Sequence, residues 1–259
     1  MIRFEGVRVR YGAVEAVRGV DFEAPAGRLT ALVGPNGSGK SSCVRALLAR
    51  DATAGGDVWL GTTRVASLAE RARARCVAVV PQRETPAFPM PVREFVALGR
   101  FPWDDAAPVT ARHVDAALDR AGALSVADRS TDAVSGGEWQ RVRMARALAQ
   151  DTPAIVLDEP TAFLDIAHEM AAFELLRALA DEGRAVLVVT HQLNLVARFA
   201  DTVVLLHDGR VAASGTPDVV MTGPTLERVY GWPIVVSRDP AVGAPMLIPL
   251  RSSRTPTSG

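Results

Sequence analysis

The amino-acid sequence predicts an α/β fold in which a parallel sheet is combined with an inserted helical segment. Four short apolar runs are typical of strands buried on both faces, as in parallel sheets. These runs are Leu29–Val33, Cys76–Val80, Ala154–Leu157 and Ala185–Thr190. Helical patterns lie between them, and one helix has an apolar stripe made of Ile166, Met170, Phe173 and Leu176. This alternation of strands and helices predicts the α/β class.

The N-terminal segment and the middle of the chain predict two different additions to this sheet. Alternating residues over Arg3–Arg10, followed by Val14–Val17 and Val20–Glu23, predict a small antiparallel β region. Residues 84–150 are mostly helical in pattern and begin with the proline-rich stretch ETPAFPMPV. We therefore expect a helical subdomain over about residues 84–150.

Two short strands are expected near the C-terminus, at Ile234–Ser237 and Met246–Leu250, separated by a Pro/Gly turn. Because Pro249 has no amide hydrogen, its strand should lie at a sheet edge. The expected organisation is one main domain over residues 1–230, a β-hairpin extension over 231–250 and a disordered tail over 251–259.

Composition excludes several functional classes. The 259 residues carry 29 basic and 29 acidic side chains, and this zero net charge argues against a general nucleic-acid binder. Hydrophobic residues make up 48% of the chain, as in a folded globular protein. Cys43 and Cys76 are far apart in the sequence, so neither a disulfide framework nor a zinc site is expected, and a reducing compartment fits.

The sequence predicts no membrane-spanning segment of its own. The N-terminal MIRFEG lacks the basic-then-apolar layout of a signal peptide. The longest apolar runs of the whole sequence, such as CVAVV and TVVLL, are too short to cross a bilayer. A membrane role would therefore need another chain to do the spanning.

A glycine-rich phosphate loop follows the first buried strand. It runs through Gly34, Pro35, Asn36, Gly37, Ser38, Gly39, Lys40, Ser41 and Ser42, and a helical pattern follows it. Glycines let consecutive amide groups point into one concavity, and the helix N-terminus adds partial positive charge. Lys40, the only lysine in the sequence, supplies a compact charge for β- and γ-phosphates, and Ser41 offers a hydroxyl to Mg²⁺.

Polar side chains follow three other strands, at the sheet edge where ligands bind in open α/β folds. Asp158 and Glu159 end the strand AIVL, where the aspartate is placed to hold Mg²⁺ and the glutamate to activate water. Gln82 and His191 follow two further strands. These residues predict hydrolysis of a bound triphosphate at this edge.

A second helix N-terminus suited to an anion is formed by Ser135, Gly136 and Gly137 before the helical run that begins near Trp139. The phosphate loop is sufficient to bind one nucleotide. A second phosphate-binding site in the same chain therefore predicts a symmetric dimer, with nucleotide bound between the phosphate loop of one subunit and the helix N-terminus of the other.

These motifs, in this order, resemble those of the ATP-binding-cassette (ABC) ATPases from Tyr11 to about Gly231. GPNGSGKSS resembles Walker A, VVPQ the Q-loop, VSGGE the signature, IVLDEP Walker B, TAFLD the D-loop and VVTH the H-loop. The signature departs from the LSGGQ pattern of the family, because Val134 replaces Leu and Glu138 replaces Gln. The resemblance implies the ABC ATPase fold, with a P-loop core, an antiparallel β region and an inserted helical subdomain, and it implies ATP and Mg²⁺ as ligands.

The resemblance also implies a role for each motif residue. Glu159 is the expected catalytic base and His191 the expected contact of the γ-phosphate. Gln82 is expected to touch Mg²⁺ together with Ser41 and Asp158. Further expected roles are adenine stacking by Tyr11 (whose alternative is a core aromatic), dimer-seam placement of Asp165, and γ-phosphate binding in the opposite subunit by Ser135, Gly136 and Gly137.

Among ABC proteins, the chain resembles the stand-alone subunits of iron–siderophore, haem and cobalamin importers, in stretches such as REFVALGRFPW and DEPTAFLDIAHEM. Iron–siderophore import is the first expectation. The chain is expected to lie peripherally on the cytoplasmic face of the inner membrane. Expected partners are a second copy, two integral-membrane permease subunits and, indirectly, a periplasmic or lipoprotein substrate-binding protein. No nucleic-acid partner is expected.

The permease is expected to dock near Pro86–Trp103, where Phe88, Met90 and Trp103 either contact it or pack inside the subdomain. Two rival functions remain open. One is a soluble ABC ATPase of iron–sulfur cluster assembly, which would share every nucleotide motif. The other is a P-loop small-molecule kinase, which would leave the SGGE segment unexplained.

Overall fold

A mixed six-stranded sheet is the centre of the computed structural model, which describes residues 1–48, 53–86, 88–161 and 164–251. Its strand order is β10-β9-β3-β8-β7-β6, and all neighbours are parallel except β10 and β9. The strands are β10 (Arg210–Gly215), β9 (Thr202–His207), β3 (Arg28–Val33), β8 (Ala185–Val189), β7 (Ala154–Asp158) and β6 (Val77–Val80). The predicted α/β class is confirmed. One boundary differs, because Cys76 ends the helix before β6.

A second, antiparallel sheet has the order β2-β1-β4-β5. Its strands are β1 (Ile2–Tyr11), β2 (Val14–Ala24), β4 (Thr53–Leu60) and β5 (Thr63–Arg64). The β1–β2 pair confirms the expected N-terminal antiparallel region. The strands β4 and β5 were not predicted from the sequence, since β4 carries two adjacent glycines that weaken a strand pattern.

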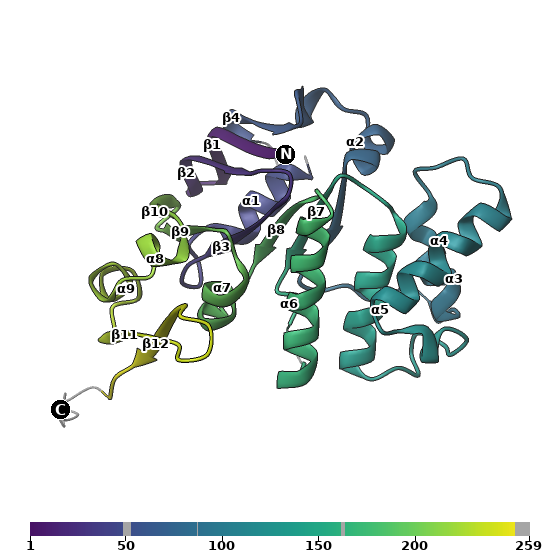
Figure 1. Ribbon diagram of the computed structural model, residues 1–259. Helices are drawn as coiled ribbons and strands as arrows, with labels where there is room; N and C mark the ends of the chain where they lie inside the picture. Colours follow the sequence, from purple (N-terminus) through teal and green to yellow (C-terminus); the bar gives the residue numbers. More distant parts are fainter. Residues whose placement is uncertain (49–52, 87, 162–163, 252–259) are drawn as a thin grey trace, which may run out of the picture.

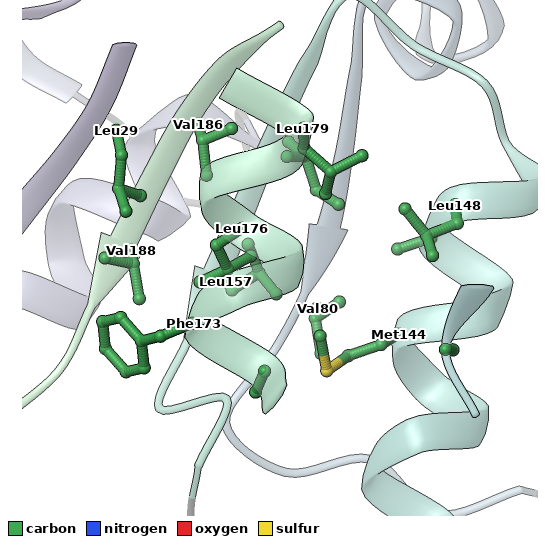
Figure 2. Packing of buried hydrophobic residues seen from close by; sticks show 14 of the residues in the cluster. Leu29, Val80, Met144, Leu148, Leu157, Phe173, Leu176, Leu179, Val186 and Val188 are labelled. Atoms are coloured by element: carbon green, nitrogen blue, oxygen red, sulfur yellow. The ribbon is translucent and has the colours of Figure 1, made fainter. Parts of the chain in front are cut away.

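The central sheet separates two hydrophobic clusters, because alternate residues of each strand point to opposite faces. In β3, Leu29, Ala31 and Val33 face one cluster, whereas Leu32 faces the other. The first cluster contains residues of α6 (Ile166–Asp181) and α7 (Leu193–Phe199). Figure 2 shows part of this packing, with side chains of α6 against those of the strands. The second contains residues of α1 (Lys40–Leu47) and of the antiparallel sheet.

The stripe predicted for α6 is correct at its C-terminal end and wrong at its start. Phe173 and Leu176 are buried and Met170 is half-buried, but Ile166 is 80% exposed. The reason is that Ile166 belongs to the first turn of α6, where residues 165–168 are all exposed.

Helices between residues 92 and 149 gather beside the sheet, on the side away from β1, β2 and β4 (Figure 1). They are α3 (Val92–Ala97), η2 (Leu98–Arg100), α4 (Ala107–Arg120), η3 (Leu124–Val126) and α5 (Gly136–Ala149). The rings of Phe95 and Trp139 join α3 to α5, with centroids 4.7 Å apart. Two shorter helices, η1 (Val65–Ser67) and α2 (Glu70–Cys76), precede β6.

The chain continues after β10 through α8 (Pro217–Val220) and α9 (Gly223–Tyr230) into a two-stranded antiparallel sheet. Its strands, β11 (Ile234–Arg238) and β12 (Pro245–Pro249), agree with the two strands expected there. The expected disordered tail lies, apart from residue 251, outside the described residues. Among the helices described, none has the length and apolar character needed to traverse a membrane.

Candidate active site

A pocket of about 300 Å³ lies where β3, β6 and β7 end. It brings together residues that the sequence singles out in three separate segments. The lining residues are Ala16, Asn36, Gly37, Ser38, Gly39, Lys40, Ser41, Ser42, Gln82, Asp158 and Glu159. Ala16 was not foreseen, because it belongs to β2 and carries no chemical signal in the sequence.

Two glycines of the phosphate loop are required by close backbone approach. Gly34 has φ +147°, and a Cβ there would lie 2.2 Å from the Leu206 carbonyl oxygen. Gly39 has φ +104°, and a Cβ there would lie 2.6 Å from the Ala16 carbonyl oxygen. The loop is therefore pressed between β2 and β9 with no room for side chains at these positions.

Lys40 folds back over the loop that precedes it. Its Nζ donates hydrogen bonds to the carbonyl oxygens of Gly34, at 2.7 Å, and Pro35, at 2.9 Å. The residue is only 9% exposed. Burial lowers the pKa of Lys40, and the nearby charges of Glu159 and Asp158 oppose that shift. The ammonium is thus held in the pocket by two neutral carbonyl oxygens, whereas an anionic ligand would supply a negatively charged acceptor.

Asp158 ends β7 and is 6% exposed. Burial raises its pKa, and so does the charge of Glu159, while a hydrogen bond from Ser41 and the charge of Lys40 oppose the rise. Ser41, Gln82 and Asp158 offer hydroxyl, amide and carboxylate oxygens, which are donors that Mg²⁺ accepts. Within the described part of the chain, no three or more His, Cys, Asp or Glu residues are grouped to hold a metal.

Glu159 and His191 form a pair across two neighbouring strand ends. The Oε2 atom of Glu159 lies 2.8 Å from Nδ1 of His191. The Glu159 amide donates to the carbonyl oxygen of Val189, at 2.8 Å, which ties the β7 end to the β8 end. Glu159 also adopts a left-handed backbone conformation, with φ +53°. Its side chain is 11% exposed and that of His191 is 68% exposed, so the pair spans the pocket edge and the surface.

The SGGE segment lies outside this pocket, at the start of α5. The Glu138 amide donates to the Ser135 hydroxyl, at 3.3 Å, and the Ser135 amide donates to the Glu138 carboxylate, at 2.7 Å. This reciprocal cap explains what a glutamate does at the position where the family pattern has glutamine. The hydrogen bond from the Ser135 amide lowers the pKa of Glu138. Gly136 and Gly137 form the first turn of the helix.

Tyr11 and Asp165 also lie outside the pocket lining. Tyr11 ends β1 and is 37% exposed, so it is not a core aromatic. Asp165 caps α6 by accepting a hydrogen bond from the His168 amide, at 2.9 Å, and this bond lowers its pKa. The D-loop residues 162 and 163 lie outside the described residues.

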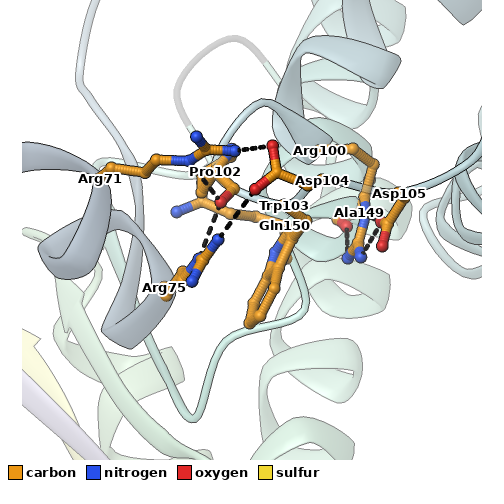
Figure 3. Close-up of polar contacts among 9 residues, drawn as sticks. All are labelled: Arg71, Arg75, Arg100, Pro102, Trp103, Asp104, Asp105, Ala149 and Gln150. Atoms are coloured by element: carbon orange, nitrogen blue, oxygen red, sulfur yellow. Dashed lines mark hydrogen bonds and ion pairs between the residues drawn. The ribbon is translucent and has the colours of Figure 1, made fainter.

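The three candidate docking residues divide between surface and interior. Phe88 is 64% exposed, whereas Met90 is half-buried and packs against the core. Trp103 is half-buried and bonded inward: its Nε1 donates to the Gln150 carbonyl oxygen, at 2.7 Å, and the guanidinium groups of Arg75 and Arg100 lie 5.2 and 5.3 Å from its ring centroid. Figure 3 shows this network, in which side chains of α2 reach the segment 100–105.

The profile of the family described as "ABC transporter" matches residues 17–162 of this chain. The chain is 44% identical over 237 residues to the hemin import ATP-binding protein HmuV of Nocardia farcinica, covering 90% of this chain and 82% of that protein. It is 35% identical to the ferric enterobactin transport ATP-binding protein FepC of Escherichia coli, covering 96% of this chain and 94% of that protein.

Solved structures give the same result. An inward-facing ABC transporter described as metal-chelate type matches with a TM-score of 0.83 and 25% identity, covering 97% of this chain and 98% of that chain. The dimeric cassette MJ0796 in a post-hydrolysis state with ADP and phosphate matches with a TM-score of 0.76 and 28% identity, covering 83% of this chain and 98% of that chain. The six sequence motifs, the fold and these similarities agree, and the chain belongs to the ABC transporter family of ATPases.

Proposed function

We propose that this chain is the ATP-hydrolysing subunit of an importer that takes up a metal chelate through a separate membrane permease. The observation that carries the hydrolytic part is the convergence of Lys40, Asp158 and Glu159 in one pocket, with the exposed His191 bonded to Glu159. The importer part is supported by the relatives named for hemin and ferric enterobactin transport.

The residues of the pocket suit a magnesium–triphosphate. Lys40 exchanges its two carbonyl partners for β- and γ-phosphate oxygens, which gives a charge-assisted contact in a buried place. Ser41, Gln82 and Asp158 would hold Mg²⁺, which when bound neutralises developing phosphate charge. Glu159 would orient and deprotonate the attacking water. His191, held through Nδ1, would contact the γ-phosphate through its other ring nitrogen.

The SGGE helix end supports a dimer of two copies. The Ser135 and Glu138 amides are used within the cap. Gly136 and Gly137 lie outside the pocket of their own chain, where their amides would serve a phosphate bound by another copy. Asp165 then lies near the seam between the copies. The solved MJ0796 cassette, which is dimeric, supports this arrangement.

The permease docks in a groove of about 420 Å³ beside the Gln82 segment. Residues of α2, β6, α5 and the segment after β6 line it, among them Glu70, Arg73, Val77, Arg83 and Arg146. The Gln150 side chain joins the end of α5 to β6 by donating to the Val77 carbonyl oxygen at 3.1 Å. The contacts drawn in Figure 3 hold α2 to the segment 100–105. Phe101 and Leu98 are exposed apolar residues of the segment 86–103, where docking is expected from the sequence.

Two copies and two permease subunits would place the chain peripherally on the cytoplasmic face of the inner membrane, served by a substrate-binding protein outside. The cargo class is hemin, a ferric siderophore or cobalamin, and iron–siderophore import stays a prediction within that class. Nothing in the comparisons supports the iron–sulfur assembly alternative.

Tagged chain extracted from membranes in mild detergent tests the proposal. We expect a polytopic permease to co-purify in equal amount, and the complex in proteoliposomes to release inorganic phosphate and accumulate one of the three cargoes. A tagged chain with Lys40→Ala is the matched control for transport. A phosphorylated small molecule instead of free phosphate would point to a kinase, and a chain recovered without any membrane protein would contradict the importer.

A further inference from the structure

The segment from Gln82 to Glu84 separates two cavities. Gln82 lines the phosphate pocket, whereas Arg83 and Glu84 line the groove beside it. A contact that holds Glu84 therefore restricts the backbone of Gln82, two residues earlier. The structure shows what holds it.

One face of α5 holds Glu84 through three side chains. The Nε1 atom of Trp139 donates to the Glu84 carbonyl oxygen, at 3.1 Å. The Nε atom of Arg143 lies 3.5 Å from Glu84 Oε2, and Nη1 of Arg146 donates to Oε1. Positions 139, 143 and 146 are four and three residues apart, so they share one helix face. We call these three residues with Glu84 the Glu84 clamp.

Arg143 is the buried member of this clamp. Its side chain is 5% exposed, and its Nη1 donates to the Gln140 side-chain oxygen at 2.7 Å. Nε and Nη2 are buried and have no hydrogen-bond partner among the described residues, and neither has Oε2 of Glu84. A buried guanidinium needs a carboxylate nearby, and Glu84 supplies it. A small movement of Glu84 toward Arg143 would therefore let these donors form a hydrogen bond with Oε2 of Glu84.

We propose that Glu84 and Arg143 are positioning residues that fasten the Gln82 segment to α5, so that Gln82 and the Ser135–Gly137 end of α5 shift together. The inference rests on the proposed dimer, in which Gln82 serves the ATP of its own chain and the helix end serves the ATP of the other. If Gln82 and this helix end move together, ATP bound at one site of the dimer changes the affinity of the other site for ATP.

Steady-state ATP hydrolysis measured against ATP concentration tests this coupling in the full chain. The wild type should show a Hill coefficient approaching about 2, the number of shared sites. Glu84→Gln and Arg143→Gln should lower it toward about 1, and Arg143→Lys, which keeps the charge, should restore part of it. The matched control is Arg120→Gln, because Arg120 also joins a helix of residues 92–149 to the rest of the fold, through Glu182, without touching the Gln82 segment. The control should keep the wild-type coefficient.

A structural role alone would lower the melting temperature or the maximal rate while leaving the Hill coefficient at the wild-type value, and that result would overturn the proposal. If Arg143→Gln does not fold, Glu84→Gln decides the question, because the Glu84 side chain is 19% exposed and its replacement is isosteric. A wild type that hydrolyses ATP without cooperativity and without dependence on protein dilution would overturn the dimer itself. A cooperative wild type with equally cooperative variants would overturn the clamp alone.

Discussion

The Nδ1 atom of His191 lies 2.8 Å from Oε2 of Glu159, across the neighbouring ends of β8 and β7. This contact occupies one ring nitrogen of the histidine and one carboxylate oxygen of the glutamate. The remaining nitrogen and oxygen are left for substrate and water. The two residues therefore act as one unit, and each should depend on the other for its orientation.

Replacing Glu159 with Gln should separate ATP binding from ATP hydrolysis. The amide keeps the size of the side chain but cannot accept a proton, so turnover should fall by about 10²–10⁴-fold. ATP should still bind, and a dimer should accumulate on size-exclusion chromatography in the presence of ATP. Glu174→Gln, on an exposed position of α6, is the control and should behave as the parent. Hydrolysis by Glu159→Gln at the parent rate would show that another group is the base.

The single lysine offers a pH experiment. Burial lowers the pKa of Lys40, because it disfavours the charged ammonium. At a given pH between about 8 and 10 a larger fraction of Lys40 should therefore be the neutral, nucleophilic amine than for an ordinary lysine, whose pKa is about 10.4. Acylation by an amine reagent, followed by peptide mass spectrometry, should give a rate profile displaced to lower pH.

ATP with Mg²⁺ should protect Lys40 from this reagent. The amino group of Met1 is the internal control, because burial lowers its pKa as well and it lies outside the phosphate pocket. Equal protection of both amines, or a Lys40 profile displaced to higher pH, would contradict the site as described.

Tyr11 should contribute to nucleotide affinity by stacking. It is exposed at the end of β1, and a base stacked on an aromatic ring gains about 1–3 kcal/mol. Tyr11→Ala should therefore raise the Kd for ATP by about 5- to 100-fold in isothermal titration, while Tyr11→Trp should preserve it. An unchanged Kd for the alanine variant would remove Tyr11 from the site.

Replacing Phe101 with Ala should weaken permease binding, whereas replacing Trp103 with Ala should lower the stability of the chain. Phe101 is 82% exposed, so its loss should reduce the amount of co-purifying permease and leave hydrolysis by the isolated chain unchanged. Trp103 lies beside two guanidinium groups and donates to Gln150, so its loss should lower the melting temperature. If the Phe101→Ala variant recovers the same amount of permease as the parent, Phe101 does not belong to the docking surface.

The sequence predicted those parts of the molecule whose signals are local. Continuous apolar runs identified β3, β7 and β8, and the polar residues that follow the strands identified most of the pocket lining. The inward orientation of Trp103 could not be predicted, because Arg75 and Arg100 reach it from separate elements. The hold of α5 on Glu84 also depends on tertiary contact, since Glu84 lies 55 residues before Trp139.

The left-handed backbone conformation of Glu159 lowers the stability of the folded chain, and the fold itself does not require a glutamate at this position. A side chain at φ +53° is disfavoured by about 1–2 kcal/mol, and glycine would relieve that penalty. Random variation screened only for thermal resistance should therefore drift toward glycine at this position and lose catalysis as it does so. A glutamate retained there marks a point where the demands of chemistry outweigh those of folding.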